Sequence, residues 1–258
     1  MMYKKFMLLI IMLLCLVVKA QSVKNTIAVD TTLFKKNTQL QFKTKQLIIP
    51  AVLIGYGIIG IGNDQLESFN NQIREEVRED IDKKFTIDDL SQYAPFASVY
   101  ALDALGIKGK NNFRDKTIIL ATSYLIMGIA VNSLKHSFKV ERPDASSMNS
   151  FPSGHTATAF MGAELLYQEY KDTSIWYGIS GYIVAAGTGT FRMYNNKHWL
   201  TDVVAGAGIG ILSTKAAYWL YPSINKLLTS KKNNTNKKTV FIPYYDGKLA
   251  GFGLVSKF

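Results

Sequence analysis

Three polar clusters organise this chain: Lys135-His136-Ser137-Phe138-Lys139-Val140-Glu141-Arg142-Pro143, then Pro152-Ser153-Gly154-His155, and finally Arg192-Met193-Tyr194-Asn195-Asn196-Lys197-His198-Trp199-Leu200-Thr201-Asp202. Apolar segments separate the clusters. Together they supply three cationic side chains, two histidines and an aspartate, which are the groups that a phosphate pocket needs. The sequence therefore predicts an anion site assembled from three distant segments.

The residue types in each cluster suit that chemistry. Arginine forks and a lysine ammonium can hold the non-bridging oxygens of a phosphoryl group. Ser153 is a candidate helix N-cap, and Gly154 would let backbone N–H groups approach an anion closely. His198 and Asp202 are four residues apart, so on a helix the carboxylate could fix the tautomer of the imidazole. The other ring nitrogen would then be free to attack.

The spacing K-x6-R-P, then P-S-G-H, then R-x5-H-x3-D resembles that of the type-2 phosphatidic acid phosphatases. Their superfamily also contains bacterial class A acid phosphatases and vanadium haloperoxidases, and the resemblance covers residues 117–221. It implies that Lys135, Arg142 and Arg192 clamp the phosphate together with Ser153 and the backbone of Gly154.

The resemblance also implies the catalytic roles. His198 would be the nucleophile that forms a phosphohistidine, and Asp202 would orient it. His155 would protonate the leaving alkoxide and then activate the hydrolytic water. The sequence departs from the family at Phe191, because the family usually has serine just before the third-cluster arginine. That change removes one hydroxyl donor and affects substrate positioning more than the chemistry.

Composition narrows the class of partner. Lys and Arg number 30 against 19 Asp and Glu, a net charge of +11 over 258 residues. Such a charge can indicate nucleic acid, an anionic membrane surface or an anionic substrate. The hydrophobic segments favour the last two, so we expect no nucleic-acid partner. Cys15 is the only cysteine, which excludes an intrachain disulfide. No metal-ligand cluster accompanies the motifs, and we expect neither metal nor cofactor.

From its N-terminus onward, the sequence divides into four segments. Residues 1–20 resemble a secretory signal peptide, with an uncleaved anchor helix as the alternative. Residues 21–46 are polar and basic. Residues 47–222 would form a helical phosphatase domain, and residues 223–258 a basic linker with a short tail that could make a β-hairpin.

The fold class predicted for the domain is all-α, a bundle of about six core helices. The helical segments expected are 47–62, 65–84, 93–107, 117–134, 156–167, 174–190 and 203–221. Among these, 65–84 is amphipathic and 117–134 is the best candidate to span a membrane. We attribute Gly206, Gly208 and Gly210 to close helix packing, and Glu164 to a packed carboxylate.

The topology is left open by conflicting signals. A basic loop at 108–116 would be cytoplasmic by the positive-inside tendency, which turns the motifs outward. A cleaved signal, followed by two spanning segments, would instead place that loop outside. We expect a cell-envelope protein that is membrane-associated, with its site facing the periplasm or exterior. A soluble periplasmic form is the alternative.

The function expected is hydrolysis of phosphate monoesters or diphosphates, most simply those of lipids such as phosphatidate or polyprenyl diphosphate. The partner would be a phosphorylated lipid or a small phosphate ester. The alternatives are a soluble acid phosphatase of broad specificity, a phosphoryl or lipid-phosphate transferase, and a non-catalytic phosphate binder. The motifs identify neither the leaving group nor any protein partner.

Overall fold

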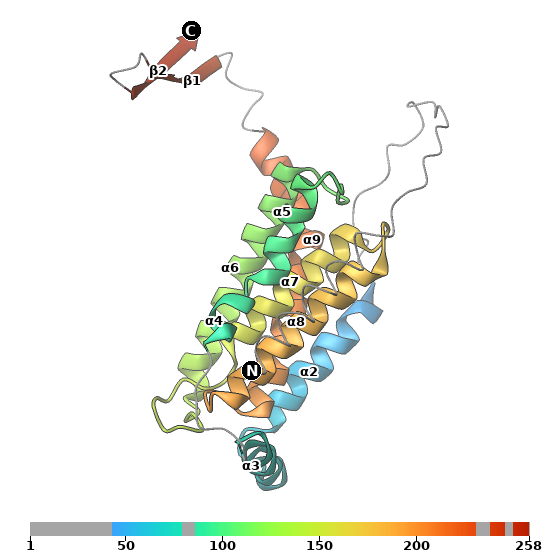
Figure 1. Cartoon of the computed structure of the whole chain (residues 1–258), viewed down its shortest axis with the longest axis vertical. Helices are drawn as coiled ribbons and strands as arrows, with labels where there is room; N and C mark the ends of the chain where they lie inside the picture. Colours follow the sequence, from blue (N-terminus) through green and yellow to red (C-terminus); the bar gives the residue numbers. More distant parts are fainter. Residues whose placement is uncertain (1–42, 79–85, 231–237, 246–249, 258) are drawn as a thin grey trace, which may run out of the picture. The chain divides into compact units, whose positions relative to one another are not determined.

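The computed structural model describes residues 43–78, 86–230, 238–245 and 250–257. The signal predicted at 1–20 lies outside these residues, as does most of the polar segment 21–46. The elements are η1 (Thr44–Leu47), α2 (Ile48–Ile59), α3 (Asp64–Arg78), α4 (Ile87–Ser91), α5 (Ala94–Ala104), α6 (Phe113–Phe138), α7 (Gly154–Tyr170), α8 (Ile175–Tyr194), α9 (Leu200–Ser230), β1 (Lys238–Tyr245) and β2 (Ala250–Lys257) (Figure 1). The predicted all-α bundle is confirmed.

Helix α7 is the centre of the bundle. It packs against α5, α6, α8 and α9 (Figure 1). Its N-terminal half is mostly apolar or small on every side, and the polar side chains of its C-terminal half, Glu164, Gln168 and Glu169, are buried as well, so the helix is stable only when it is surrounded. Ala157, Met161 and Leu165 accordingly have no exposed surface. The histidine of the second motif lies at the beginning of this helix, and is therefore attached to the central, buried helix of the bundle.

Close packing around α9 depends on its three glycines, as predicted. A Cβ on Gly206 would lie 2.5 Å from the carbonyl oxygen of Ser153, and one on Gly210 would lie 2.3 Å from that of Ala157. On the other side, a Cβ on Gly208 would lie 2.8 Å from the carbonyl oxygen of Pro50. Larger residues would separate α9 from α7 and from α2.

The helices alternate in direction, which collects the three motifs at one end. Lys135 ends α6, Ser153 precedes α7, and His198 precedes α9. At the opposite end, Arg114 near the start of α6 donates to Asn225 near the end of α9 at 2.9 Å. We call these the motif end and the basic end.

Helix α3 crosses the motif end. The chain bends by 96° between the segment Thr44–Ile59 and α3, which lies roughly across the other helices (Figure 1). Asn70 donates to Thr201 at 3.0 Å, and Arg74 donates to Asn196 at 2.8 Å. The amphipathic helix predicted at 65–84 is therefore present as Asp64–Arg78, and its polar side chains hold the segment that carries the third motif.

Most helix boundaries differ from the prediction by a few residues, and the larger differences are at α5 and α9. The segment expected at 93–107 forms α5 at Ala94–Ala104, and the short α4 before it was not anticipated. Helix α9 continues through Pro222 to Ser230 instead of ending at Tyr221. One proline removes one backbone hydrogen bond, and a long packed helix can tolerate that loss. The expected tail hairpin is present, with β1 and β2 antiparallel and Lys238 opposite Lys257.

Within the part of the chain that the structure describes, two helices are long and apolar enough to span a membrane: α6, as predicted, and α9. Only 22% of the most apolar window of α6 is buried. Leu125 and Ile129 on that helix are 63% and 61% exposed, and Trp176 on α8 is 71% exposed. Apolar faces of this kind are stable in lipid and costly in water. The chain is therefore a membrane protein, and the soluble alternative is not favoured.

Candidate active site

The second motif caps α7 and is tied to the third. Ser153 is the N-cap, as predicted, and its Oγ accepts from the backbone N–H of Thr156 at 3.4 Å. Its own backbone N–H donates to the carbonyl oxygen of Asp202 at 3.0 Å. The first turn of α7 and the first turn of α9 are therefore held side by side, although they lie nearly 50 residues apart in the sequence.

His198 and Asp202 come together in a different way from the prediction. His198 precedes α9 and does not lie on a helix face with Asp202; the turn at Trp199 brings the two side chains together. Nδ1 of His198 lies 3.6 Å from Oδ2 of Asp202. That oxygen also accepts from the backbone N–H of Trp199 at 2.9 Å and from Ser150 Oγ at 2.5 Å. Nε2 of His198 carries no hydrogen bond to any of the described residues.

Ser150 is a residue that sequence reasoning missed. It is fully buried, and its Oγ lies 3.5 Å from Nδ1 of His198 as well as donating to Asp202. It belongs to none of the three motifs. The only signal was its place two residues before Pro152, and that is too weak to single out one serine.

Burial sets the charge of His198. The ring is 3% exposed, and this burial lowers the pKa of His198 to about 4, although Asp202 opposes the shift. Lys135 and Arg192 lower it further because they are positive. The imidazole is therefore neutral at physiological pH, which is the form that can act as a nucleophile.

The cations of the motifs converge near this ring. Lys135 donates to the carbonyl oxygens of Asn149 and Ser150. Burial and the nearby Arg192 lower the pKa of Arg142. Nε of Arg142 and Nε of Arg192 are both buried without a hydrogen-bond partner among the described residues. A buried N–H without a partner is costly, and a bound oxyanion would satisfy it.

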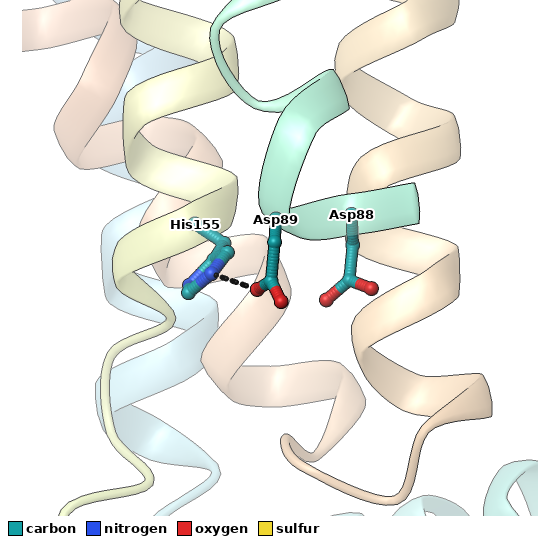
Figure 2. A group of neighbouring side chains, drawn as sticks. All are labelled: Asp88, Asp89 and His155. Carbon is teal, nitrogen blue, oxygen red and sulfur yellow. Dashed lines mark hydrogen bonds and ion pairs between the residues drawn. The ribbon is translucent and has the colours of Figure 1, made fainter. Parts of the chain in front are cut away.

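Two aspartates of α4 enter the site, and sequence reasoning missed both (Figure 2). Asp88 is 1% exposed and accepts from Nη1 of Arg192 and from Asn195, the latter at 2.9 Å. Asp89 bonds Nε2 of His155 at 2.9 Å, and its Oδ1 lies 3.8 Å from Nη1 of Arg192. No pattern in residues 86–91 marks these acids as functional. The contacts span 66 to 107 residues of sequence.

The three side chains in Figure 2 also correct the expectation that no metal-ligand cluster accompanies the motifs. Asp88, Asp89 and His155 offer ligand atoms that lie within 4.8 Å of one another. However, Arg192 and Asn195 already bond both oxygens of Asp88. The guanidinium beside them would repel a cation. The arrangement suits a charge-paired acid better than a metal ligand.

The loop that carries Arg142 is fixed by an ion pair. Lys197 donates to Asp144 at 2.6 Å. Burial alone would raise the pKa of Asp144, but the bonds from Lys197 and Ser146 hold it well below its usual range. Trp199 Nε1 also donates to the carbonyl oxygen of Glu141 at 2.9 Å. These contacts join the first motif to the third.

The departure at Phe191 has no local replacement. Phe191 stacks edge-on against Tyr194, with ring centroids 5.8 Å apart. The hydroxyl of the neighbouring Thr190 donates to the carbonyl oxygen of Ala186 at 3.0 Å. Neither side chain supplies the hydroxyl donor that the family usually has at this place.

Comparison with known proteins gives matches in the same region. Residues 116–226 match the PAP2 superfamily. A lipid A 1-phosphatase of Porphyromonas gingivalis is 40% identical over 162 residues, which are 60% of this chain and 36% of that protein. The bacitracin transport permease protein BcrC of Bacillus licheniformis is 30% identical over 104 residues, or 35% of this chain and 49% of that one. This chain thus spans between about a third and a half of these relatives.

Among solved structures, LpxE of Aquifex aeolicus is similar with a TM-score of 0.45 and 24% identity. The similarity covers 58% of this chain and 94% of that one.

Proposed function

We propose that this chain, whose residues 116–226 belong to the PAP2 superfamily, is a membrane phosphatase that removes phosphate from a lipid phosphomonoester through a phosphohistidine. One observation carries the proposal. Among the described residues, the Nε atoms of Arg142 and Arg192 are buried without a hydrogen-bond partner, and they lie near a neutral, oriented histidine. Guanidinium N–H groups that are free to bind the oxygens of a phosphoryl group beside a nucleophile are what a phosphoryl-transfer site requires.

In the first step, Nε2 of His198 attacks phosphorus. Asp202 and Ser150 hold the ring from its Nδ1 side. The bond from phosphorus to the leaving oxygen breaks, and His155 gives that oxygen a proton. Lys135, Arg142, Arg192 and the N–H groups at the start of α7 neutralise the phosphoryl oxygens during transfer.

In the second step, water attacks the phosphohistidine. His155, now neutral, takes a proton from this water, and the bond from Nε2 of His198 to phosphorus breaks. Inorganic phosphate leaves, and both histidines return to their starting protonation states. No metal takes part in either step.

A lipid substrate is supported by the surroundings of the site. The spanning helix α6 ends at the motif end, and its exposed apolar residues lead toward that end. An acyl chain in the same leaflet would bring a headgroup phosphate to the depth of Lys135. The name of one relative, a lipid A 1-phosphatase, points the same way, and a lipid A phosphate is the first substrate to try.

An outward-facing site is supported by the distribution of charge. Lys108 and Lys110, which precede α6, and Arg114 in its first turn lie at the basic end. Lys43 and Lys45 precede α2, which is antiparallel to α9 because its last turn meets Thr201 while Pro50 meets Gly208. By the positive-inside tendency the basic end is cytoplasmic. The motif end then faces the periplasm or exterior.

The test is phosphate release by purified protein in detergent. The substrates are lipid A, phosphatidate, a polyprenyl diphosphate and p-nitrophenyl phosphate. We expect a lipid phosphate to give the highest kcat/KM and His198→Ala to abolish turnover. His136→Ala is the matched control, since His136 belongs to no motif position, and should retain activity.

Trapping with radiolabelled substrate tests the intermediate. Label on wild-type protein should be acid-labile and absent from His198→Ala. Acid-stable label on serine would overturn the assignment of the nucleophile. Release from p-nitrophenyl phosphate alone would contradict the lipid substrate while leaving the phosphatase in place.

A further inference from the structure

We propose that Asp89 is a positioning residue for proton transfer: it binds Nε2 of His155 and leaves Nδ1 as the ring nitrogen that serves the leaving group. The inference rests on the proposed function and assigns a role to a residue outside all three motifs. Its basis is the contact of 2.9 Å between Asp89 Oδ1 and His155 Nε2 (Figure 2).

The geometry fits positioning better than simple surface pairing. His155 is the second residue of α7, so its backbone is fixed. Its side chain is still 30% exposed, and burial alone does not hold the ring in one orientation. Asp89 supplies the missing constraint. Among the described residues no other hydrogen bond to either ring nitrogen of His155 is present.

Helix α4 is itself anchored, so Asp89 is held in place. Ser91 bonds Thr188 of α8 at 2.8 Å through the two hydroxyl groups. Asp88 is buried against Arg192 and Asn195, also of the α8 segment. Without these contacts, a helix as short as α4, with five residues, would not be held at this position. Both anchors place Asp89 between His155 and Arg192.

The charges around His155 come from two elements. Asp88 and Asp89 face it from α4, and Arg192 faces it from α8. Burial lowers the pKa of His155, Arg192 lowers it further, and the two aspartates oppose the shift. Asp89 therefore keeps the ring protonated to a higher pH than it would otherwise reach.

The proton balance of the step is simple. The imidazolium of His155 holds one proton on Nε2, bonded to Asp89, and one on Nδ1. As the bond from phosphorus to oxygen breaks, the Nδ1 proton passes to the leaving oxygen. His155 becomes neutral, and Asp89 remains a carboxylate throughout. In the second step Nδ1 takes a proton from water.

Leaving groups that differ in their need for a proton test the proposal. An alkyl phosphate needs protonation, whereas p-nitrophenyl phosphate departs as a stable anion. We expect Asp89→Asn to lower kcat/KM for the alkyl phosphate by about 10-fold to 100-fold, up to the lower end of what a general acid contributes, because Asp89 acts through His155 and the acid itself remains. For p-nitrophenyl phosphate the loss should stay below about threefold, because proton donation contributes little there.

The pH profile is a second readout that a structural role would not change. Activity that needs protonated His155 falls as the pH rises through the pKa of that ring. Removing the negative charge of Asp89 lowers this pKa, so the basic limb of kcat/KM should move to lower pH in Asp89→Asn. Asp89→Glu, which keeps the charge, should restore part of the rate and of the limb.

Controls separate this role from folding and from the proposed function. Glu76→Gln removes an exposed carboxylate of α3 and should change neither readout. His155→Ala should show the same leaving-group dependence, and adding Asp89→Asn to it should cost nothing more. Equal losses on both substrates, or an unmoved basic limb, would overturn the proposal. A wild type that is inactive on both esters would instead contradict the proposed function.

Discussion

In the proposed mechanism, the pair His198 and Asp202 sets the chemistry at the scale of single residues. Asp202 Oδ2 receives the backbone N–H of Trp199 and the hydroxyl of Ser150, so its position is fixed before any substrate binds. Changing Asp202 to Asn would keep the shape but put an amide beside Nδ1 of His198. We expect kcat to fall by about 10²-fold to 10⁴-fold.

The measurement is kcat on the best lipid phosphate, with a thermal melt in detergent as the control for folding. Ser150→Ala should show a smaller loss, because it removes one of the contacts that fix the carboxylate and leaves the carboxylate itself. Full activity of Asp202→Asn would show that this carboxylate does not orient the nucleophile.

The buried ring of His198 gives a prediction about pH. Burial disfavours the imidazolium, so the pKa of His198 is lowered to about 4. The ring should stay neutral as the pH falls from 7 and gain its proton only near pH 4. The chain has three histidines, so NMR titration of labelled imidazoles can resolve them. The signal that is lost in His198→Ala is that of His198. Titration of this ring near its ordinary value would contradict its burial against Lys135 and Arg192.

The effect of removing metal ions can also be predicted at this scale. Asp88 is paired with Arg192 and Asn195, and neither proposed step uses a metal ion. Activity should therefore survive EDTA, assayed on the same lipid phosphate after extensive dialysis. A loss that Mg²⁺ restores would mean that the cluster of Figure 2 binds metal.

Gly210 gives the sharpest test at the scale of helices. A Cβ there would lie 2.3 Å from the carbonyl oxygen of Ala157 and 2.8 Å from the backbone nitrogen of Met161. Backbone cannot move aside as a flexible side chain can, so Gly210→Ala must push α9 from α7. We expect a loss of stability of about 1–3 kcal/mol, the range for overpacking.

Gly128→Ala is the matched control, since nothing lies within 4 Å of a Cβ on that glycine of α6. It should leave the melting temperature unchanged or raise it slightly, because alanine favours helix by roughly 0.5–1 kcal/mol. Equal melting temperatures for the two variants would contradict the packing of α9 on α7.

At this scale, helices that are determined by adjacent residues could be predicted from the sequence, whereas a helix that depends on distant contacts could not. The helix starting at Ser153 was predictable because the cap, the glycine and the apolar run are adjacent in sequence. Helix α4 was not, because its five residues carry no periodic pattern and its partners Arg192 and His155 lie far along the chain. Asp88 and Asp89 reach the site only when α4 packs on α8. The three motifs were found because spacing within each one is local.

Whole-molecule topology depends on the direction of α2. Because α2 is antiparallel to α9, positions 43 and 108 must lie on the same side of any membrane that the bundle spans. A site facing outward then requires residue 43 to be cytoplasmic. A signal cleaved after Ala20 leaves the new N-terminus outside, so it is compatible with this arrangement only if the chain crosses the membrane again before residue 43.

Single cysteines can decide between these arrangements, because Cys15 is the only natural one. In a Cys15→Ser background, an impermeant maleimide applied to spheroplasts should label Met148→Cys, which is 56% exposed at the motif end. Lys43→Cys and Lys108→Cys should react only after lysis, since the basic end is cytoplasmic. Labelling of Lys108→Cys with protection of Met148→Cys would reverse the proposed orientation. A third outcome is labelling of Lys43→Cys and Met148→Cys with Lys108→Cys protected. It would mean that α2 does not cross the membrane, and a signal peptide cleaved after Ala20 would then be compatible with an outward-facing site.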